Sequence, residues 1–108
     1  MEQNAIQQKI QSQLRKGILE FIILSDLKDG PKYPREIISD LSKAGLEIVE
    51  GTLYPLFLRL AKQNLVSYEW KEAGGHPRKY YKLTKFGERV LNIYKDEWSS
   101  LNTIIANL

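Results

Sequence analysis

Apolar side chains recur every three or four residues over the first quarter of the chain, which is the period of an amphipathic helix. From residue 2 to about residue 28 they form two adjacent stripes: Ile6, Ile10, Leu14, Ile18 and Ile22 in one, and Leu19, Ile23 and Leu27 in the other. The pattern predicts one long helix with a buried second half, ended by Asp29-Gly30-Pro31. Gly17 costs this helix about 1 kcal/mol relative to Ala, which indicates a close packing contact at that position.

Two shorter helices are predicted next, with a short connector between them. The first begins at Pro34, which suits the first turn of a helix, and runs to about Ala44, where Gly45 caps it. The second begins at residues 51–53 and ends near Gln63. Its inner stripe is Leu53, Leu56, Phe57 and Leu60, which leaves Thr52, Tyr54, Pro55, Arg59 and Lys62 outside the stripe.

After residue 64 the helical period gives way to the alternation of a strand. Over residues 65–71, Val66, Tyr68 and Trp70 alternate with Ser67, Glu69 and Lys71. Residues 72–77 are predicted to form a loop, and residues 78–83 the return strand. Thr84 is the predicted cap of a last helix that runs almost to the C-terminus. Positions on one face of that helix recur at threes and fours: Phe86, Val90, Tyr94, Glu97 or Trp98, Leu101, Ile105 and Leu108.

This order of elements predicts a mainly α protein with a small β-hairpin, a winged helix-turn-helix with long N- and C-terminal dimerisation helices. We expect one domain over residues 1–108, with a DNA-binding core at 14–83, a dimerisation helix at 84–108 and a helix extension at 1–13. The terminal helices exceed what so small a core needs, so a second copy is expected to cover their stripes. The expected interface residues are Ile6, Ile10, Leu14, Tyr94, Trp98, Leu101, Ile105 and Leu108. The alternative is that the same stripe packs within one chain.

Composition argues against most kinds of chemistry. The 108 residues include no cysteine and a single histidine, so one chain offers few ligands for a transition metal and no thiol. A Gly-rich phosphate loop and a nucleophile elbow are both missing, and Gly74-Gly75 fits a hairpin turn. We therefore expect no enzyme activity and no cofactor. Without a signal-peptide pattern or an apolar run of about 18 residues, a cytoplasmic location without a membrane partner is expected.

Positive charge is concentrated in one part of the chain, although the net charge is only +3. Residues 52–82 contain six basic side chains, Arg59, Lys62, Lys71, Arg78, Lys79 and Lys82, against two acidic ones. A helix able to lie in a groove beside a cationic hairpin is typical of DNA binding. Two alternatives stay open here: Tyr54 either faces the major groove or packs its ring on the core, and the hairpin bases either contact DNA or only solubilise the hairpin.

Several strings of residues resemble the PadR family of bacterial transcriptional regulators over nearly the whole chain. They are Leu14-Arg15-Lys16-Gly17, Glu50-Gly51-Thr52-Leu53-Tyr54-Pro55 with Arg59-Leu60, Asn64-Leu65-Val66, and Pro77-Arg78-Lys79-Tyr80-Tyr81-Lys82-Leu83-Thr84 with Gly87. The second and fourth strings together, at this spacing, are specific. One segment departs from the family, which often has Tyr-Gly-Tyr-Glu-Ile where this chain has Tyr33-Pro34-Arg35-Glu36-Ile37. Arg35 replaces an aromatic residue there, and a phosphate contact is expected from it instead.

The resemblance implies a homodimeric repressor of the short subgroup, bound to a pseudo-palindromic operator in double-stranded DNA and released by a small effector. The expected DNA-binding residues are Tyr33, Arg35, Thr52, Tyr54, Pro55, Arg59, Lys62, His76, Arg78, Lys79 and Tyr80. Trp98, expected near the two-fold axis, is the candidate for stacking a planar hydrophobic effector, and the alternative is a simple packing role. The main rival hypothesis is a winged-helix module that binds a protein instead of DNA.

Overall fold

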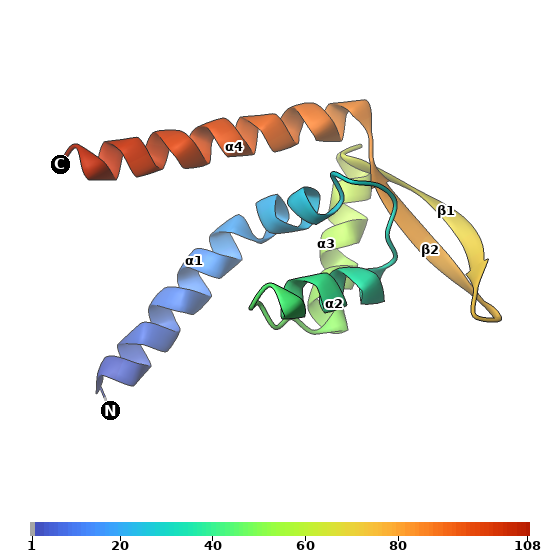
Figure 1. The fold of residues 1–108 in the computed structure, drawn as a ribbon, viewed down its shortest axis with the longest axis horizontal. Coiled ribbons are helices and arrows are strands. Elements are labelled where there is room, and N and C mark those ends of the chain that lie inside the picture. Colours follow the sequence, from blue (N-terminus) through green and yellow to red (C-terminus); the bar gives the residue numbers. More distant parts are fainter. Residues whose placement is uncertain (1) are drawn as a thin grey trace.

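The computed structural model describes residues 2–108. It consists of α1 (Glu2–Asp26), α2 (Pro34–Lys43), α3 (Glu50–Lys62), β1 (Val66–Ala73), β2 (His76–Leu83) and α4 (Lys85–Ala106). Figure 1 shows α2, α3 and the second half of α1 gathered in one head, from which the β-hairpin projects to one side. The first half of α1 and most of α4 extend to the other side and diverge from each other (Figure 1). The predicted class, a mainly α winged helix-turn-helix, is confirmed.

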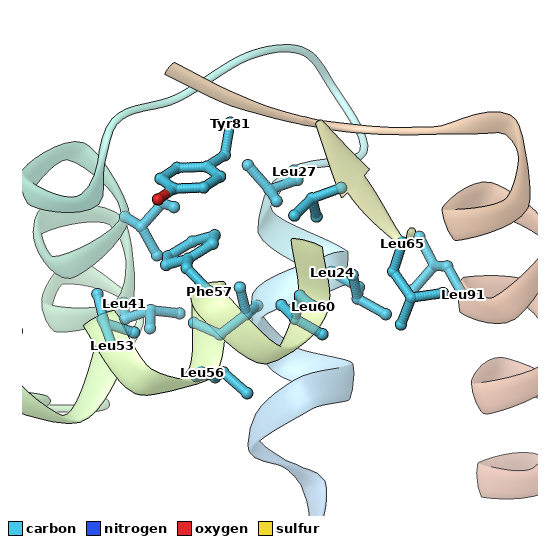
Figure 2. Close-up of a cluster of buried hydrophobic side chains, with 13 residues drawn as sticks. Leu24, Leu27, Leu41, Leu53, Leu56, Phe57, Leu60, Leu65, Tyr81 and Leu91 are labelled. Atoms are coloured by element: carbon cyan, nitrogen blue, oxygen red, sulfur yellow. The ribbon is translucent and has the colours of Figure 1, made fainter. Parts of the chain in front are cut away.

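A single cluster of buried side chains holds the head together (Figure 2). All four residues of the predicted inner stripe of α3 belong to it, and Phe57 stacks on Tyr81 of β2 with ring centroids 4.1 Å apart. The other members come from the surrounding elements and the segments next to them: Ile23, Leu24, Leu27, Ile37, Leu41, Leu65, Val66 and Leu91. Because the inner side of α3 is buried against α1, α2 and the base of the hairpin, its opposite side is left free for function.

The hairpin departs from the sequence prediction at its turn. The predicted loop at residues 72–77 is wrong, because pairing continues to Ala73 and His76 and the turn consists of Gly74 and Gly75 alone. Both glycines have positive φ, 61° and 83°, as a two-residue type I′ turn requires. The apolar residues of the alternating strand are not buried together beyond Val66. Tyr68 and Trp70 are 46% and 64% exposed because only the base of the hairpin reaches the head (Figure 1).

The junction between the hairpin and α4 is tightly built. The predicted cap is confirmed: the Thr84 hydroxyl accepts a hydrogen bond from the Gly87 amide at 2.9 Å and donates one to the Asn64 carbonyl at 2.7 Å. A Cβ placed on Gly87 would lie 2.0 Å from the carbonyl oxygen of Leu65. By contrast, the close contact predicted at Gly17 is wrong within the chain, because a Cβ there meets no atom of residues 2–108 within 4 Å. The start of α4 is thus fixed against the chain that follows α3.

The segment between α1 and α2 joins three parts of the head. Lys32 pairs through its backbone with Tyr81 of β2, with N–O distances of 2.9 and 2.8 Å. Its ammonium lies 3.0 Å from a carboxylate oxygen of Asp26 and 2.6 Å from one of Asp40. Burial raises the pKa of the Asp26 carboxyl, whereas the hydrogen bond from Lys32 lowers the pKa of Asp40. Lys32 therefore ties the end of α1 and the second half of α2 to strand β2.

Candidate nucleic-acid interface

The exposed side of α3 divides into two flanks. Thr52 and Arg59 face α1: Thr52 lines a groove of about 330 Å³ with Arg15 and Leu19 of that helix. The Arg59 guanidinium lies 3.9 Å from the carboxylate of Glu20, also on α1. Both residues were expected to contact DNA together with Tyr54, but the fold turns them away from the hairpin. Pro55 is exposed within the helix, between the two flanks.

The other flank of α3 faces the hairpin, which we call the wing (β1, β2 and their turn). Tyr54, Leu58 and Lys62 follow one another at spacing four and line a groove of about 440 Å³ opposite Tyr68 and Lys79 of the wing. Leu58 is 60% exposed. A large apolar side chain on an otherwise polar outer face is suited to contact with an apolar surface such as the methyl group of thymine.

The sequence left two positions open for Tyr54: a ring that faces the major groove or a ring that packs on the core. Its side chain is 54% exposed, so the ring lines the groove instead of entering the core. Its hydroxyl donates a hydrogen bond of 3.2 Å to Glu50, and this bond raises the pKa of the Tyr54 phenol. The other oxygen of Glu50 accepts a bond of 2.8 Å from Nε of Arg35. Two predicted DNA-binding residues thus share one carboxylate.

The strand register separates the two wing bases that the sequence treats as a pair. Arg78 is paired with Lys71, and their side chains lie on one face of the wing with those of Tyr80 and His76. The Arg78 guanidinium lies 4.7 Å from the centroid of the Tyr33 ring, and the rings of Tyr33 and Tyr80 meet edge to face with centroids 5.2 Å apart. Tyr33, Arg78 and Tyr80 therefore form one cluster, which holds the guanidinium near the start of α2.

Lys79 occupies the opposite face of the wing. It is paired with Trp70, and its ammonium lies 4.0 Å from the ring of Tyr68 and 5.7 Å from the ring of Trp70. The Lys79 ammonium forms no ion pair with a carboxylate of residues 2–108, so its N–H donors are not taken up by an acidic side chain there. His76 is exposed at the tip of the wing, next to the two-glycine turn.

One groove brings together groups from three separate segments. It has a volume of about 320 Å³ and lies between the start of α2, the start of α3 and the wing; its lining includes Tyr33, Arg35, Tyr54, Arg78 and Lys79. These five residues were all predicted to bind DNA. Sequence reasoning missed Glu50, Leu58 and Trp70. Spacing contained a signal for the first two, since each stands four residues from Tyr54 on the same helix.

Comparison with known proteins identifies the family. Residues 23–93 match the transcriptional regulator PadR-like family. The chain belongs to this family. The family consists of transcriptional regulators, which confirms both the resemblance and the expectation that the protein is not an enzyme. Among residues 2–108, no helix is both long enough and apolar enough to cross a membrane.

Solved PadR-like structures share this fold over most of the chain. A PadR-like transcription factor from Bacteroides fragilis is 47% identical, with a TM-score of 0.79 over 92% of this chain and 97% of the other. A PadR family regulator from Eggerthella lenta is 36% identical, with a TM-score of 0.90 over 99% of this chain and 95% of the other. PadR from Bacillus subtilis, solved in complex with operator DNA, is 21% identical and has the same fold, with a TM-score of 0.65 over 71% of this chain and 45% of the other.

In this PadR-like chain the predicted dimer residues form two exposed stripes on the diverging ends of α1 and α4 (Figure 1). The stripe on α1 consists of Ile6, Ile10 and Leu14. The stripe on α4 consists of Trp98, Leu101, Ile104 and Ile105, and exposed Leu108 follows just beyond the end of the helix. Tyr94 differs from the others because it already has partners in its own chain. Its ring stacks on Phe21 at 5.4 Å, and its hydroxyl donates a hydrogen bond to Glu20. For Tyr94, the fold supports the alternative of packing within one chain.

Proposed function

We propose that this protein is a dimeric, sequence-specific DNA-binding repressor that acts on a pseudo-palindromic operator and is released by a small effector. The observation that carries the proposal is the groove where Arg35 and Tyr54 face Arg78 and Lys79. The two wing bases rest on aromatic rings and form no ion pair with residues 2–108, so both charges are available to phosphate groups. The shared fold of the operator-bound Bacillus subtilis PadR supports the same reading.

The proposed binding mode follows from the flanks of α3. The helix enters the major groove, with Tyr54 and Leu58 at base edges and Lys62 at a phosphate. The wing carries Arg78 and His76 to the adjacent backbone or minor groove. Arg59 reaches a phosphate from the other flank, once it leaves the carboxylate of Glu20.

The proposal is tested by selecting binding sites from a random-sequence DNA library with the purified protein. We expect an enriched inverted repeat whose half-sites lie about 34 Å, or a multiple of that distance, apart, since a two-fold dimer presents two recognition helices. The selected duplex and a scrambled duplex of the same composition are then titrated at two salt concentrations. A winged-helix module that binds only protein would enrich no sequence, and that result would overturn the proposal.

Replacing Arg78 by Ala should reduce the salt dependence of DNA binding. Each phosphate contact contributes a log–log slope of about 0.9, so the loss of one contact should flatten the slope by about that amount. Because a phosphate contact is read from every sequence, affinity for the selected and scrambled duplexes should fall together. Lys95→Ala on the exposed part of α4 is the matched control, with an unchanged slope. A slope that also stays constant for Arg78→Ala would remove Arg78 from the contacts.

The structural route proposed for release by an effector runs through Glu20. This carboxylate accepts a hydrogen bond from Tyr94 of α4 and lies 3.9 Å from Arg59 of the recognition helix. A shift of α4 would therefore be transmitted to α3 through two contacts, Tyr94 with Glu20 and Glu20 with Arg59. Coupling also requires that the effector bind the two positions of α4 with different affinity.

Trp98 is the proposed effector contact. It is 45% exposed, tilts against Phe21 with centroids 6.3 Å apart, and would lie near its symmetry mate in the proposed dimer. In a Trp70→Phe background, where Trp98 alone emits, planar cationic or phenolic aromatics should quench emission and weaken operator binding about 5- to 150-fold. Compounds that quench without any effect on DNA binding, or no quenching at all, would leave Trp98 with a packing role only.

A further inference from the structure

Glu50 places a negative charge directly beside two residues of the proposed DNA-binding surface, Arg35 and Tyr54. It is the first residue of α3 and its side chain is 36% exposed. One carboxylate oxygen accepts the 2.8 Å bond from Nε of Arg35, and the other accepts the 3.2 Å bond from the hydroxyl of Tyr54. Both partners line the groove with Arg78 and Lys79. A carboxylate in this place repels phosphate groups, so its presence calls for a physical reason.

The geometry of the contact between Glu50 and Arg35 supplies a physical reason for this carboxylate. Arg35 is 71% exposed, and without a partner its long side chain would sample many rotamers that binding must then restrict. The bond to Glu50 uses Nε, so the two terminal nitrogens form no hydrogen bond with residues 2–108. These terminal nitrogens are the pair with which an arginine reads guanine or clamps a phosphate. Glu50 thus holds the side chain while leaving its reading end free.

Tyr54 is held through its hydroxyl. Its ring is exposed at the groove, and the bond to Glu50 fixes its position and uses its single O–H proton, so the ring and the hydroxyl oxygen are the groups left for DNA. An acidic residue at the start of a helix also interacts favourably with the helix dipole. That simpler role would require neither Arg35 nor Tyr54, and it is the alternative that an experiment must separate.

We infer that Glu50 is a positioning residue for sequence specificity: it presets Arg35 and Tyr54 for the operator and disfavours other DNA by its charge. The inference rests on the proposed DNA-binding function. In the operator complex the ordered arginine and tyrosine offset the repulsion by base contacts. On unrelated DNA those contacts are missing and the repulsion remains.

The test is Glu50→Gln, which keeps the shape of the side chain and removes its charge. We expect affinity for the selected duplex to fall about tenfold, the discrimination of one good base contact. Affinity for the scrambled duplex should rise about threefold as repulsion is lost. The control is Glu72→Gln on the wing, an exposed acid paired across the strands with Pro77. It should raise both affinities by a similar factor and leave their ratio unchanged.

A double-mutant cycle with Arg35→Gln distinguishes positioning from the helix dipole. If Glu50 acts in part through Arg35, Glu50→Gln should cost less specificity in the Arg35→Gln background than in the wild type, so the two losses are not additive. The specificity loss that remains in that background is the part due to Tyr54 and to charge repulsion. Additive losses, or a Glu50→Gln variant that changes both affinities equally, would overturn the inference. A wild-type protein that does not distinguish the selected from the scrambled duplex would instead overturn the proposed function, and the inference with it.

Discussion

Replacing Leu101 by Asp should convert the protein to a monomer and lower its operator affinity by about 100-fold or more, a change of about 2.7 kcal/mol. Leu101 is 44% exposed in the single chain and lies in the apolar stripe of α4 between Trp98 and Ile105. A carboxylate buried in such an interface without a partner would cost several kcal/mol. A monomer would also lose the gain of binding two half-sites at once.

The fold of the head should survive this change, because Leu101 is outside the buried cluster. Ser99→Asp is the matched control: it adds the same charge to an exposed position on the opposite side of the same helix. Analytical ultracentrifugation of both variants gives the oligomeric state, and titration of the selected duplex gives the affinity. If Leu101→Asp sediments as a dimer, the interface lies elsewhere and the stripes on α1 and α4 have another partner.

Replacing Gly87 by Ala should destabilise the protein by about 1–3 kcal/mol, the usual range for overpacking a tight site. The added Cβ would be 2.0 Å from the Leu65 carbonyl oxygen, a backbone atom that cannot swing aside as a side chain would. That carbonyl also accepts the backbone hydrogen bond of Thr84 at 3.1 Å, so moving it would disturb the cap of α4. We also expect weaker operator binding, since this junction sets the direction of α4 relative to α3.

Gly51→Ala is the comparison for that prediction. A Cβ on Gly51 meets no atom of residues 2–108 within 4 Å, and Gly51 is helical, so Ala should stabilise by up to about 1 kcal/mol. Urea unfolding of the two variants measures both effects on the same scale. Equal stability of Gly87→Ala and the wild type would mean that α4 can shift at little cost, and the junction would not fix its direction.

The order and type of the elements were determined by local sequence, because a period of 3.6 or 2 is a property of neighbouring residues. The inner stripe of α3 from Leu53 to Leu60, the cap at Thr84 and the end of α2 before Gly45 all follow from residues within one or two turns. The net positive charge of residues 52–82 and the family strings are likewise readable without coordinates. These features sufficed for the fold class and for the candidate DNA-binding surface.

Tertiary structure decided which of the predicted residues act together. The sequence places Arg59 and Tyr54 outside the inner stripe of α3 but does not show which neighbour each one faces. Arg59 turns toward Glu20 of α1 and Tyr54 toward the wing, because different elements pack on the two sides of α3. The sequence also cannot join Arg35 to Glu50, which are 15 residues apart on different helices. The hairpin shows the same division. Gly74 and Gly75 permitted a tight turn, which is a local property. The position of the wing beside α2 and α3 depends instead on the packing of Tyr81 on Phe57 and on the backbone bridge to Lys32. These contacts join residues distant in sequence, which meet only when the core closes.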